Sequence, residues 1–376
     1  MSHSAESTDP GGVMIWLILA ACTGSEPNET GAADSDTVDP AAWAVDEPGP
    51  YRTGHRSWEL TFASNIDGGD RTITVHAWYP TEATEGDDVS YLGIYSDEIS
   101  LGNAEAAPPA HADGYPVHLY SHGNTMFGGD ASHLMRLFAS HGWVSLAPDH
   151  TDNLLTDSVD GSIPTSVYIH RPQDLVETLD LIEGLDPSDP LSAAVTDSVL
   201  VNGHSRGCDD VWMTMGASID PDSLAEACTR MDQGSCSEEE LAAFLSGDVS
   251  DQRMAAGITM AGTINRSYHS DEGHLSVRGP VLLMSGSNDS GHAVSESFDS
   301  LEGIDRSLLD IEGACHGSFN MGFCETLETD LGYHIVQTYA LAFGRRHLLG
   351  DDDEKVMGVL DGSVEVAAEA TIQLGD

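Results

Sequence analysis

Apolar and polar residues alternate along two neighbouring segments of the chain and then give way to short, continuously apolar runs. Residues 58–62 and 71–78 alternate, with Asp67, Gly68 and Gly69 between them, which predicts an antiparallel hairpin at the edge of a sheet. Buried strands of a parallel sheet have continuously apolar sequences. Six such runs follow, at residues 116–120, 143–147, 198–202, 257–261, 281–284 and 307–311.

Helical patterns, with apolar residues at three- or four-residue spacing, lie between or after these runs. Their residues are Leu134, Leu137 and Phe138; Leu175, Leu179 and Ile182; and Leu331, Ile335, Tyr339 and Ala342. Strands and helices in alternation predict an α/β fold, with a mainly parallel central sheet and helices on both of its faces.

Two segments depart from this alternation. A polar stretch at about residues 218–252 contains two cysteines and two short helical patterns, which predicts a small cap inserted beside the C-terminal edge of the sheet. Residues 351–376 begin with four acidic residues, and we expect them to form an acidic C-terminal tail. The folded domain is therefore predicted to span residues 51–350.

The N-terminal region has the features of an export signal. Residues 13–21 form an apolar run that is too short to span a bilayer, and the run ends at Leu19-Ala20-Ala21-Cys22. That ending resembles a bacterial lipobox, so we expect a signal peptide over residues 1–22 and a lipid on the Cys22 thiol. Residues 1–12 contain no Lys or Arg, which leaves a short buried helix or a mis-assigned start as alternatives. Residues 23–50 are predicted to be a flexible acidic linker.

The chain is strongly acidic. Its 376 residues include 14 Lys and Arg against 63 Asp and Glu, a formal net charge of −49 at pH 7. Such a chain repels the phosphate backbone of nucleic acids and anionic membrane surfaces. We therefore expect no nucleic-acid partner, membrane contact only through the lipid anchor, and location in a bacterial cell envelope or outside the cell.

Residues 203–207 read Gly-His-Ser-Arg-Gly and match the pattern G-x-S-x-G. They follow an apolar run directly and precede a helix-compatible run at 211–215, the strand-turn-helix position of a nucleophile elbow. Glycines on both sides of the serine avoid clashes in so sharp a turn. Ser205 is therefore the candidate nucleophile, and the alternative is a structural serine in a glycine-rich turn.

A serine hydroxyl needs a histidine base, and that histidine needs a carboxylate to orient it. A loop after the fifth apolar run carries Asp289, and a loop after the sixth carries His316. Serine, then acid, then base is the order found in α/β-hydrolases. Asp299 and Asp310 fall inside a predicted helix or strand, and His292 is the main rival base.

The oxyanion formed by attack on a carbonyl group needs backbone N–H donors. One comes from the residue after the nucleophile, here Arg206, and one from a loop after an earlier strand. The loop after the run 116–120 contains Asn124, whose backbone N–H is our choice for the second donor, with Thr125 as the next choice.

Three segments resemble the branch of α/β-hydrolases that contains platelet-activating-factor acetylhydrolases and dienelactone-hydrolase-like enzymes, with bacterial cutinases and PET hydrolases as close relatives. The segments read PVHLYSHGN at 116–124, LFASHGWVSLAPDH at 137–150 and HRPQD at 170–174. The resemblance covers about residues 52–344. It implies the α/β-hydrolase fold and carboxylic-ester hydrolysis by a triad of Ser205, Asp289 and His316.

The sequence departs from that branch at two places. Cys208 and Asp209 follow the elbow where these families usually continue with glycine, which predicts different helix packing there. The loop after residue 263 lacks the tryptophan that polyesterases place near the cleft, which makes a polyester substrate less favoured.

We therefore expect a monomeric serine esterase that acts on a small or polymeric ester and needs no cofactor or metal. A polyester depolymerase, a peptidase or a thioesterase with the same triad, and a non-catalytic surface-tethered binding lipoprotein are the alternatives. The occupied triad positions disfavour the binding protein. The sequence contains no H-E-x-x-H or C-x-x-C motif, and weak calcium binding by residues 351–354 is the remaining metal alternative.

The chain has six cysteines. If Cys22 is acylated, five remain, so one must be free. Cys208 lies at the start of the helix after the elbow, and we expect it to be a buried thiol and not a nucleophile.

The other four cysteines lie in two close pairs. We expect Cys228 to pair with Cys236, and Cys315 with Cys324, because export permits oxidation. The second bridge brackets His316 and would hold its loop in place. The alternative is a cytoplasmic enzyme in which all five thiols are reduced.

Overall fold

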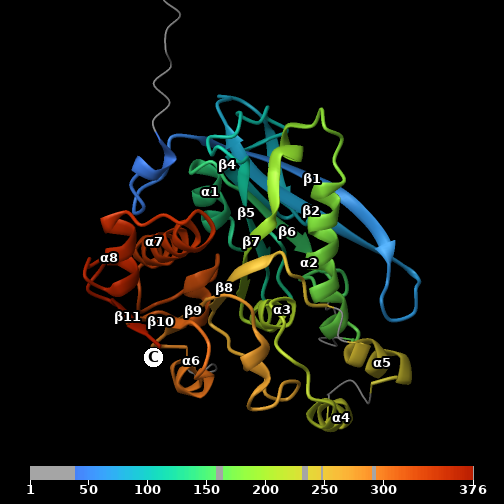
Figure 1. Ribbon diagram of the computed structural model, residues 1–376. Helices are drawn as coiled ribbons and strands as arrows, with labels where there is room; N and C mark the ends of the chain where they lie inside the picture. Colours follow the sequence, from blue (N-terminus) through green and yellow to red (C-terminus); the bar gives the residue numbers. More distant parts are fainter. Residues whose placement is uncertain (1–38, 158–163, 231–235, 247–248, 290–293, 376) are drawn as a thin grey trace, which may run out of the picture. The chain divides into compact units, whose positions relative to one another are not determined.

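The structure, a computed structural model, describes residues 39–157, 164–230, 236–246, 249–289 and 294–375 (Figure 1). Its strands are β1 (Arg52–Ala63), β2 (Asp70–Thr81), β3 (Asp87–Tyr91), β4 (Tyr95–Gly102), β5 (Tyr115–Ser121), β6 (Val144–Asp149), β7 (Ala194–His204), β8 (Met254–Met260), β9 (Val281–Gly286), β10 (Arg306–Ile311) and β11 (Ala370–Leu374). Its helices are α1 (Ser132–Ser140), α2 (Val167–Glu183), α3 (Gly207–Thr214), α4 (Pro221–Arg230), α5 (Glu238–Ser246), α6 (Val294–Phe298), α7 (Thr329–Leu348) and α8 (Glu354–Asp361).

The eleven strands of the described chain form one mixed sheet, in the order β11-β10-β9-β8-β7-β5-β6-β2-β1-β4-β3. Strands β5 to β10 are parallel to one another, whereas the flanking strands β2 and β11 pair antiparallel with β6 and β10. The predicted α/β fold with a mainly parallel sheet is confirmed. All six apolar runs coincide with these six strands to within one residue at an end, and the predicted hairpin is formed by β1 and β2.

The sheet has a hydrophobic core on each face, because successive side chains of a strand point to opposite sides. In β9, Leu282 and Met284 pack in one core, together with residues of α1, α7 and α8. Val281 and Leu283 pack in the other core, together with residues of α2, α3 and α6. The predicted helices on both faces are therefore present (Figure 1).

The sheet extends beyond the hairpin that we expected at its edge. Strand β4 pairs with β1, and β3 pairs with β4, so β3 is the strand at this edge of the sheet. The sequence of these two strands is largely polar, and many of their residues are exposed. They lack the continuous apolar run by which the central strands are recognised.

Residues 39–50 belong to the folded unit, although the sequence predicts them to be part of a flexible linker. The buried Val45 packs in the core that contains α7. The Arg345 guanidinium of α7 donates hydrogen bonds of 2.7 Å to the carbonyl oxygens of Ala41 and Trp43. These contacts need apolar and hydrogen-bonding partners from a distant helix, which the local composition does not reveal.

The C-terminal segment also differs from the expected acidic tail. Helix α8 begins after Asp353, whose side chain caps it by accepting a hydrogen bond from the Lys355 N–H. Strand β11 pairs antiparallel with β10 and thereby extends the sheet. Residues 351–376 therefore contain a helix and a strand that pack on the domain.

The stretch predicted to be an inserted cap contains α4 and α5, on the same side of the molecule as α6 (Figure 1). The expected signal peptide and Cys22 lie outside the described residues. Among the helices of the described chain, none is both long and apolar enough to cross a membrane.

Candidate active site

Ser205 lies in the turn between β7 and α3, where the sequence predicts a nucleophile elbow. Its φ of 53° is in the left-handed region that non-glycine residues rarely adopt. A Cβ on Gly203 would lie 2.2 Å from the Gly207 carbonyl oxygen, and one on Gly207 would lie 2.1 Å from the Ser121 carbonyl oxygen. Both glycines are therefore required by close backbone contacts, as the motif predicts.

Asp289 and His316 come together from separate loops. His316 Nδ1 lies 2.7 Å from Asp289 Oδ2. The Asp289 side chain is 5% exposed and the His316 side chain is 39% exposed. A buried carboxylate at Nδ1 fixes the orientation of the ring and leaves Nε2 as the nitrogen that would act as a base.

The histidine loop is joined to the elbow through His204, the residue before Ser205. His204 Nε2 forms a hydrogen bond of 3.0 Å with the His316 carbonyl oxygen, and the two rings lie 4.8 Å apart at their centroids. Within the described chain, no side chain forms a hydrogen bond with the Ser205 hydroxyl. His204 occupies a variable position of the G-x-S-x-G motif itself, and no role is predicted for it from the sequence.

The loop after β5 carries the other predicted donor, Asn124. The ideal Cβ position on Gly123, the residue before it, lies 3.0 Å from His204 Nδ1, so this loop lies beside the elbow. Thr125 has a positive φ of 54°. Among the described residues, neither the Asn124 N–H nor the Arg206 N–H has an acceptor. Both backbone N–H groups are therefore available to a ligand.

The Arg206 side chain lies against an aromatic cluster. Its guanidinium carbon is 3.6 Å from the centroid of the Tyr168 ring, and it forms an ion pair of 2.8 Å with Asp209. Tyr168 contacts Tyr268, which in turn contacts Phe244 of α5. Helix α5, in the stretch predicted to be an inserted cap, is thus connected by packing to the residue after the candidate nucleophile.

Burial changes the pKa values of two acidic groups next to the elbow. Desolvation raises the pKa of the Cys208 thiol well above its usual range, which makes this buried cysteine unreactive. Desolvation also raises the pKa of Asp209 to about 6, against the opposing effect of Arg206. As predicted, Cys208 is buried, and it is the free cysteine of the described chain.

Both predicted disulfides are present. Cys228 of α4 is bonded to Cys236, and Cys315 is bonded to Cys324. The second bond closes the loop that begins with His316, so it restricts the positions that this loop can take.

A buried hydrogen-bonded network lies beneath the elbow, and no role was predicted for its residues one by one from the sequence. Arg171 and Asp174 of α2 belong to it, although both occur in the HRPQD segment that contributed to the family resemblance. Arg171 forms an ion pair of 2.8 Å with Asp210 of α3. The Asp174 carboxylate is hydrogen-bonded to Arg71 at 2.7 Å and to His150 at 2.8 Å. The signal in the sequence was the presence of one arginine and one aspartate in the HRPQD segment. The residues that these two side chains contact are distant in sequence.

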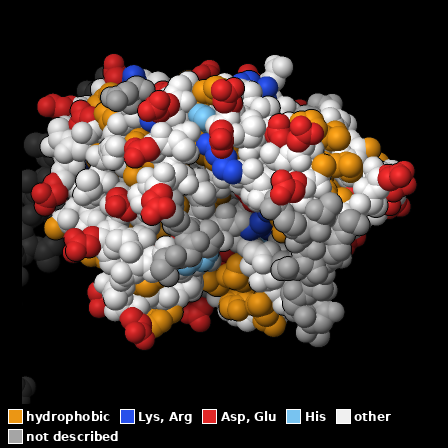
Figure 2. Space-filling model, turned by 90° about the horizontal axis from the view of Figure 1, so that it is seen from below, with side chains coloured by type: hydrophobic (Ala, Val, Ile, Leu, Met, Phe, Trp, Pro, Cys, Tyr) orange, Lys and Arg blue, Asp and Glu red, His pale blue; other side chains and the backbone are white. Residues whose placement is uncertain are grey.

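The face that carries α4, α5 and α6 is shown in Figure 2. Acidic side chains are scattered over it, and a patch of hydrophobic side chains lies beside a histidine. Met321 and Phe323, which follow His316 in the same loop, are exposed hydrophobic residues, at 39% and 80%. This loop therefore presents apolar surface next to the candidate base.

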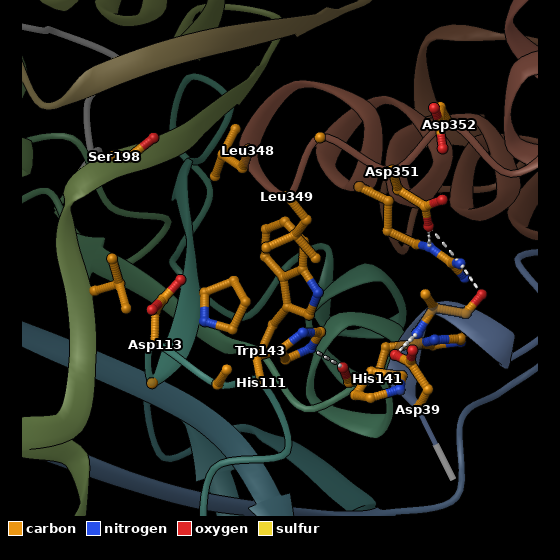
Figure 3. Close-up of a pocket in the computed structure, with 18 residues that line it drawn as sticks. Asp39, His111, Asp113, His141, Trp143, Ser198, Leu348, Leu349, Asp351 and Asp352 are labelled. Atoms are coloured by element: carbon orange, nitrogen blue, oxygen red, sulfur yellow. Dashed lines mark hydrogen bonds and ion pairs between the residues drawn. The ribbon is translucent and has the colours of Figure 1, made fainter.

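Two cavities lie away from this site. One, of about 460 Å³, is lined by residues at the N-terminal ends of β5, β6 and β7, including Asp113, Trp143 and Ser198, whereas Ser205 follows the C-terminal end of β7 (Figure 3). The other, of about 580 Å³, is lined by residues of α1, α7 and β4.

Within the described ranges, no group of three His, Cys, Asp or Glu residues is arranged to hold a metal ion. His292 lies outside the described residues.

The chain is similar in structure to a ferulic acid esterase from Streptomyces cinnamoneus, with a TM-score of 0.59 and 20% sequence identity over 88% of this chain and 98% of that chain. The fold is that of an α/β-hydrolase. No protein-family model matches the sequence, and no curated protein matches it. The match therefore shows the fold alone, and the reaction of this chain has to be argued from the site.

Proposed function

We propose that this α/β-hydrolase is a serine esterase that cleaves carboxylic esters through an acyl-enzyme on Ser205. The observation that carries the proposal is the contact between Asp289 and His316. The loop of His316 is hydrogen-bonded to His204, the residue before Ser205 in the elbow. The ferulic acid esterase fold supports it. We also propose that the chain is related to the branch that contains platelet-activating-factor acetylhydrolases and dienelactone-hydrolase-like enzymes.

In the proposed reaction, His316 Nε2 takes the proton of Ser205 Oγ as the oxygen attacks the ester carbonyl carbon. Asp289 stays ionised and stabilises the imidazolium that forms. The backbone N–H groups of Arg206 and Asn124 donate to the oxyanion. The imidazolium then protonates the leaving alcohol, and a water molecule activated by His316 releases the acid and regenerates the serine.

The decisive experiment replaces the nucleophile. Ser205→Ala is expected to abolish labelling by a fluorophosphonate probe and to lower kcat on p-nitrophenyl esters by about 10⁴-fold or more. His292→Ala serves as the matched control, and it is expected to keep most of the rate because His316 is the proposed base. Full esterase activity of Ser205→Ala would contradict the proposal.

A polymeric ester is the second candidate substrate. The exposed Met321 and Phe323 beside His316 favour it, because apolar side chains at the mouth of a site can contact a large apolar substrate. A panel of p-nitrophenyl esters of graded acyl length, run beside a polyester film and a peptide amide, separates the candidates. Release of soluble acid from the film would support the polymer, whereas cleavage of the short esters alone would support a small ester.

The two disulfides favour an oxidising compartment, because such bonds are rare in the cytosol. We therefore propose an exported protein, in a bacterial cell envelope or secreted. Acylation of Cys22, and with it a membrane tether, remains a prediction from the sequence.

A further inference from the structure

Arg171 of α2 is completely buried and connects two elements on either side of the candidate site. Its Nε donates to Asp210 Oδ2 of α3 at 2.8 Å, and its Nη2 donates to Ser121 Oγ of β5 at 3.0 Å. Nη2 also donates to the carbonyl oxygen of His122, in the loop after β5. One guanidinium therefore binds both the elbow helix and the loop that carries Asn124.

A second connection from Arg171 reaches Asn124 itself. Arg171 Nη1 donates to Asn153 Oδ1 at 2.5 Å, and Asn153 Nδ2 donates to Asn124 Oδ1 at 2.9 Å. Asn153 is fully buried in the loop after β6, whereas Asn124 is exposed. The planar guanidinium thus holds the Asn124 loop at two points, by its backbone at His122 and by the side chain of Asn124.

The same network also binds the other side of the site. Ser121 Oγ donates to Asp210 Oδ2 at 2.7 Å, so the end of β5 is bonded directly to α3. Helix α3 begins at Gly207, directly after Arg206. A displacement of β5 or of α3 would therefore change the distance between the Arg206 and Asn124 N–H groups.

We propose that Arg171 is a positioning residue that holds these two oxyanion donors in register, through Asp210 on one side and through Asn153 and Asn124 on the other. This inference rests on the proposed function. Donors that are fixed in advance stabilise an oxyanion far better than donors that must reorganise. Arginine suits this role because its guanidinium places several N–H groups in one rigid plane, which a lysine ammonium cannot do.

The test begins with Asn124→Ala, which removes the side-chain link and keeps the backbone N–H. We expect kcat on a p-nitrophenyl ester to fall about tenfold with KM unchanged, since loss of a whole oxyanion donor costs roughly 10²–10³-fold. The affinity for phenylboronic acid, whose serine adduct is tetrahedral, should fall by the same factor. Asn65→Ala, at an exposed asparagine in the β1–β2 turn, is the matched control and should change neither.

Asn153→Ala should have the same effect as Asn124→Ala, and the double variant should be no worse than either, because both remove one link. Arg171→Lys should cost about 10²-fold in kcat, because it disturbs both sides of the network. If Arg171→Lys does not fold, the cycle of Asn124 and Asn153 decides the question. Additive losses, or a fall in melting temperature with kcat and boronate affinity unchanged, would overturn the proposal.

These experiments distinguish failure of the positioning role of Arg171 from failure of the proposed function. If Ser205→Ala is inactive and Asn124→Ala matches the wild type, the chain is a serine esterase whose oxyanion donors do not depend on Arg171. If Ser205→Ala remains active, the proposed function itself fails. The pH profile of kcat/KM should be the same in Asn124→Ala as in the wild type, because the contact between His316 and Asp289 is untouched.

Discussion

The interior beneath the elbow and the surface of the domain use charge in opposite ways. In the interior, Arg71 is paired with Asp174, and the side chains are 5% and 0% exposed. On the surface, Lys355 is paired with Asp46, and the side chains are 43% and 33% exposed. Acidic residues outnumber basic ones by 63 to 14, yet several of the few arginines are buried in ion pairs.

The difference shows what each kind of pair contributes. A buried pair must offset the loss of hydration of both charges, so it adds little net stability but becomes costly when one partner is lost. An exposed pair is screened by water and salt and contributes little in either direction. The loss of a buried arginine should therefore destabilise the interior around the candidate site, whereas the surface charge governs how the whole molecule responds to salt.

Breaking one pair in each region tests this comparison most strongly. We expect Arg71→Met to lower the free energy of unfolding by about 3–5 kcal/mol, because it leaves the buried Asp174 carboxylate without its cation. Lys355→Met, the matched surface change, should cost at most about 1 kcal/mol. Urea denaturation at pH 7 measures both.

A second variant checks that the loss arises from the unpaired charge. In Arg71→Met combined with Asp174→Leu, no buried charge is left alone, so part of the stability should return. Equal losses for Arg71→Met and Lys355→Met would contradict the distinction between interior and surface.

Acid should destabilise the interior before the surface carboxylates titrate. Burial lowers the pKa of His118 from 6.5 to about 3, so below pH 6.5 the unfolded chain binds a proton there that the folded chain does not. The stability from this histidine is complete above pH 6.5 and is lost as the pH falls toward 3. His118→Leu should therefore reduce the slope of unfolding free energy against pH, between pH 6.5 and 5, by about 1 kcal/mol per pH unit.

The slope separates protonation from packing. His118 stacks on Phe138 and contacts Ser145, so the substitution also changes the stability at pH 8, where histidine is neutral in both states. The difference between two pH values within each protein cancels that packing effect. Identical slopes for the two proteins would show that His118 does not resist protonation in the fold.

Salt should act on the surface and produce the smallest change. A net charge of −49 repels itself, and about 1 M NaCl shortens the Debye length to roughly 3 Å. The melting temperature should rise by a few degrees between low and molar NaCl, and equally in KCl. A constant melting temperature would mean that the acidic residues are too widely spaced for repulsion to matter.

The sequence predicts the central sheet well because burial on both faces leaves a local signal. Each of the six apolar runs coincides with a parallel strand to within one residue, and the G-x-S-x-G motif marks the elbow locally, although the contact that requires Gly207 is with the distant Ser121. Strands β3 and β4, at one end of the sheet, and β11, at the other end, were not predicted, because their residues are largely polar or exposed. Their strand structure depends on hydrogen bonds to a neighbour that no local pattern identifies.

The candidate site divides in the same way. Ser205, Asp289 and His316 were singled out because a known chemical order connects them along the chain. Arg171 and Asn153 were not assigned a role, since their bonds join residues far apart in sequence. The long-range partners of a buried polar side chain are set by the tertiary fold.

The surface pair of Lys355 and Asp46 has a practical consequence. Lys355 is the only lysine in the sequence, and it lies on α8, which contributes no residue to the candidate site. An amine-reactive dye or a resin will therefore find one side-chain amine per molecule. Coupling through that amine would attach a single reporter at a known position, or hold molecules on a support in a common orientation with the Ser205 face left unmodified.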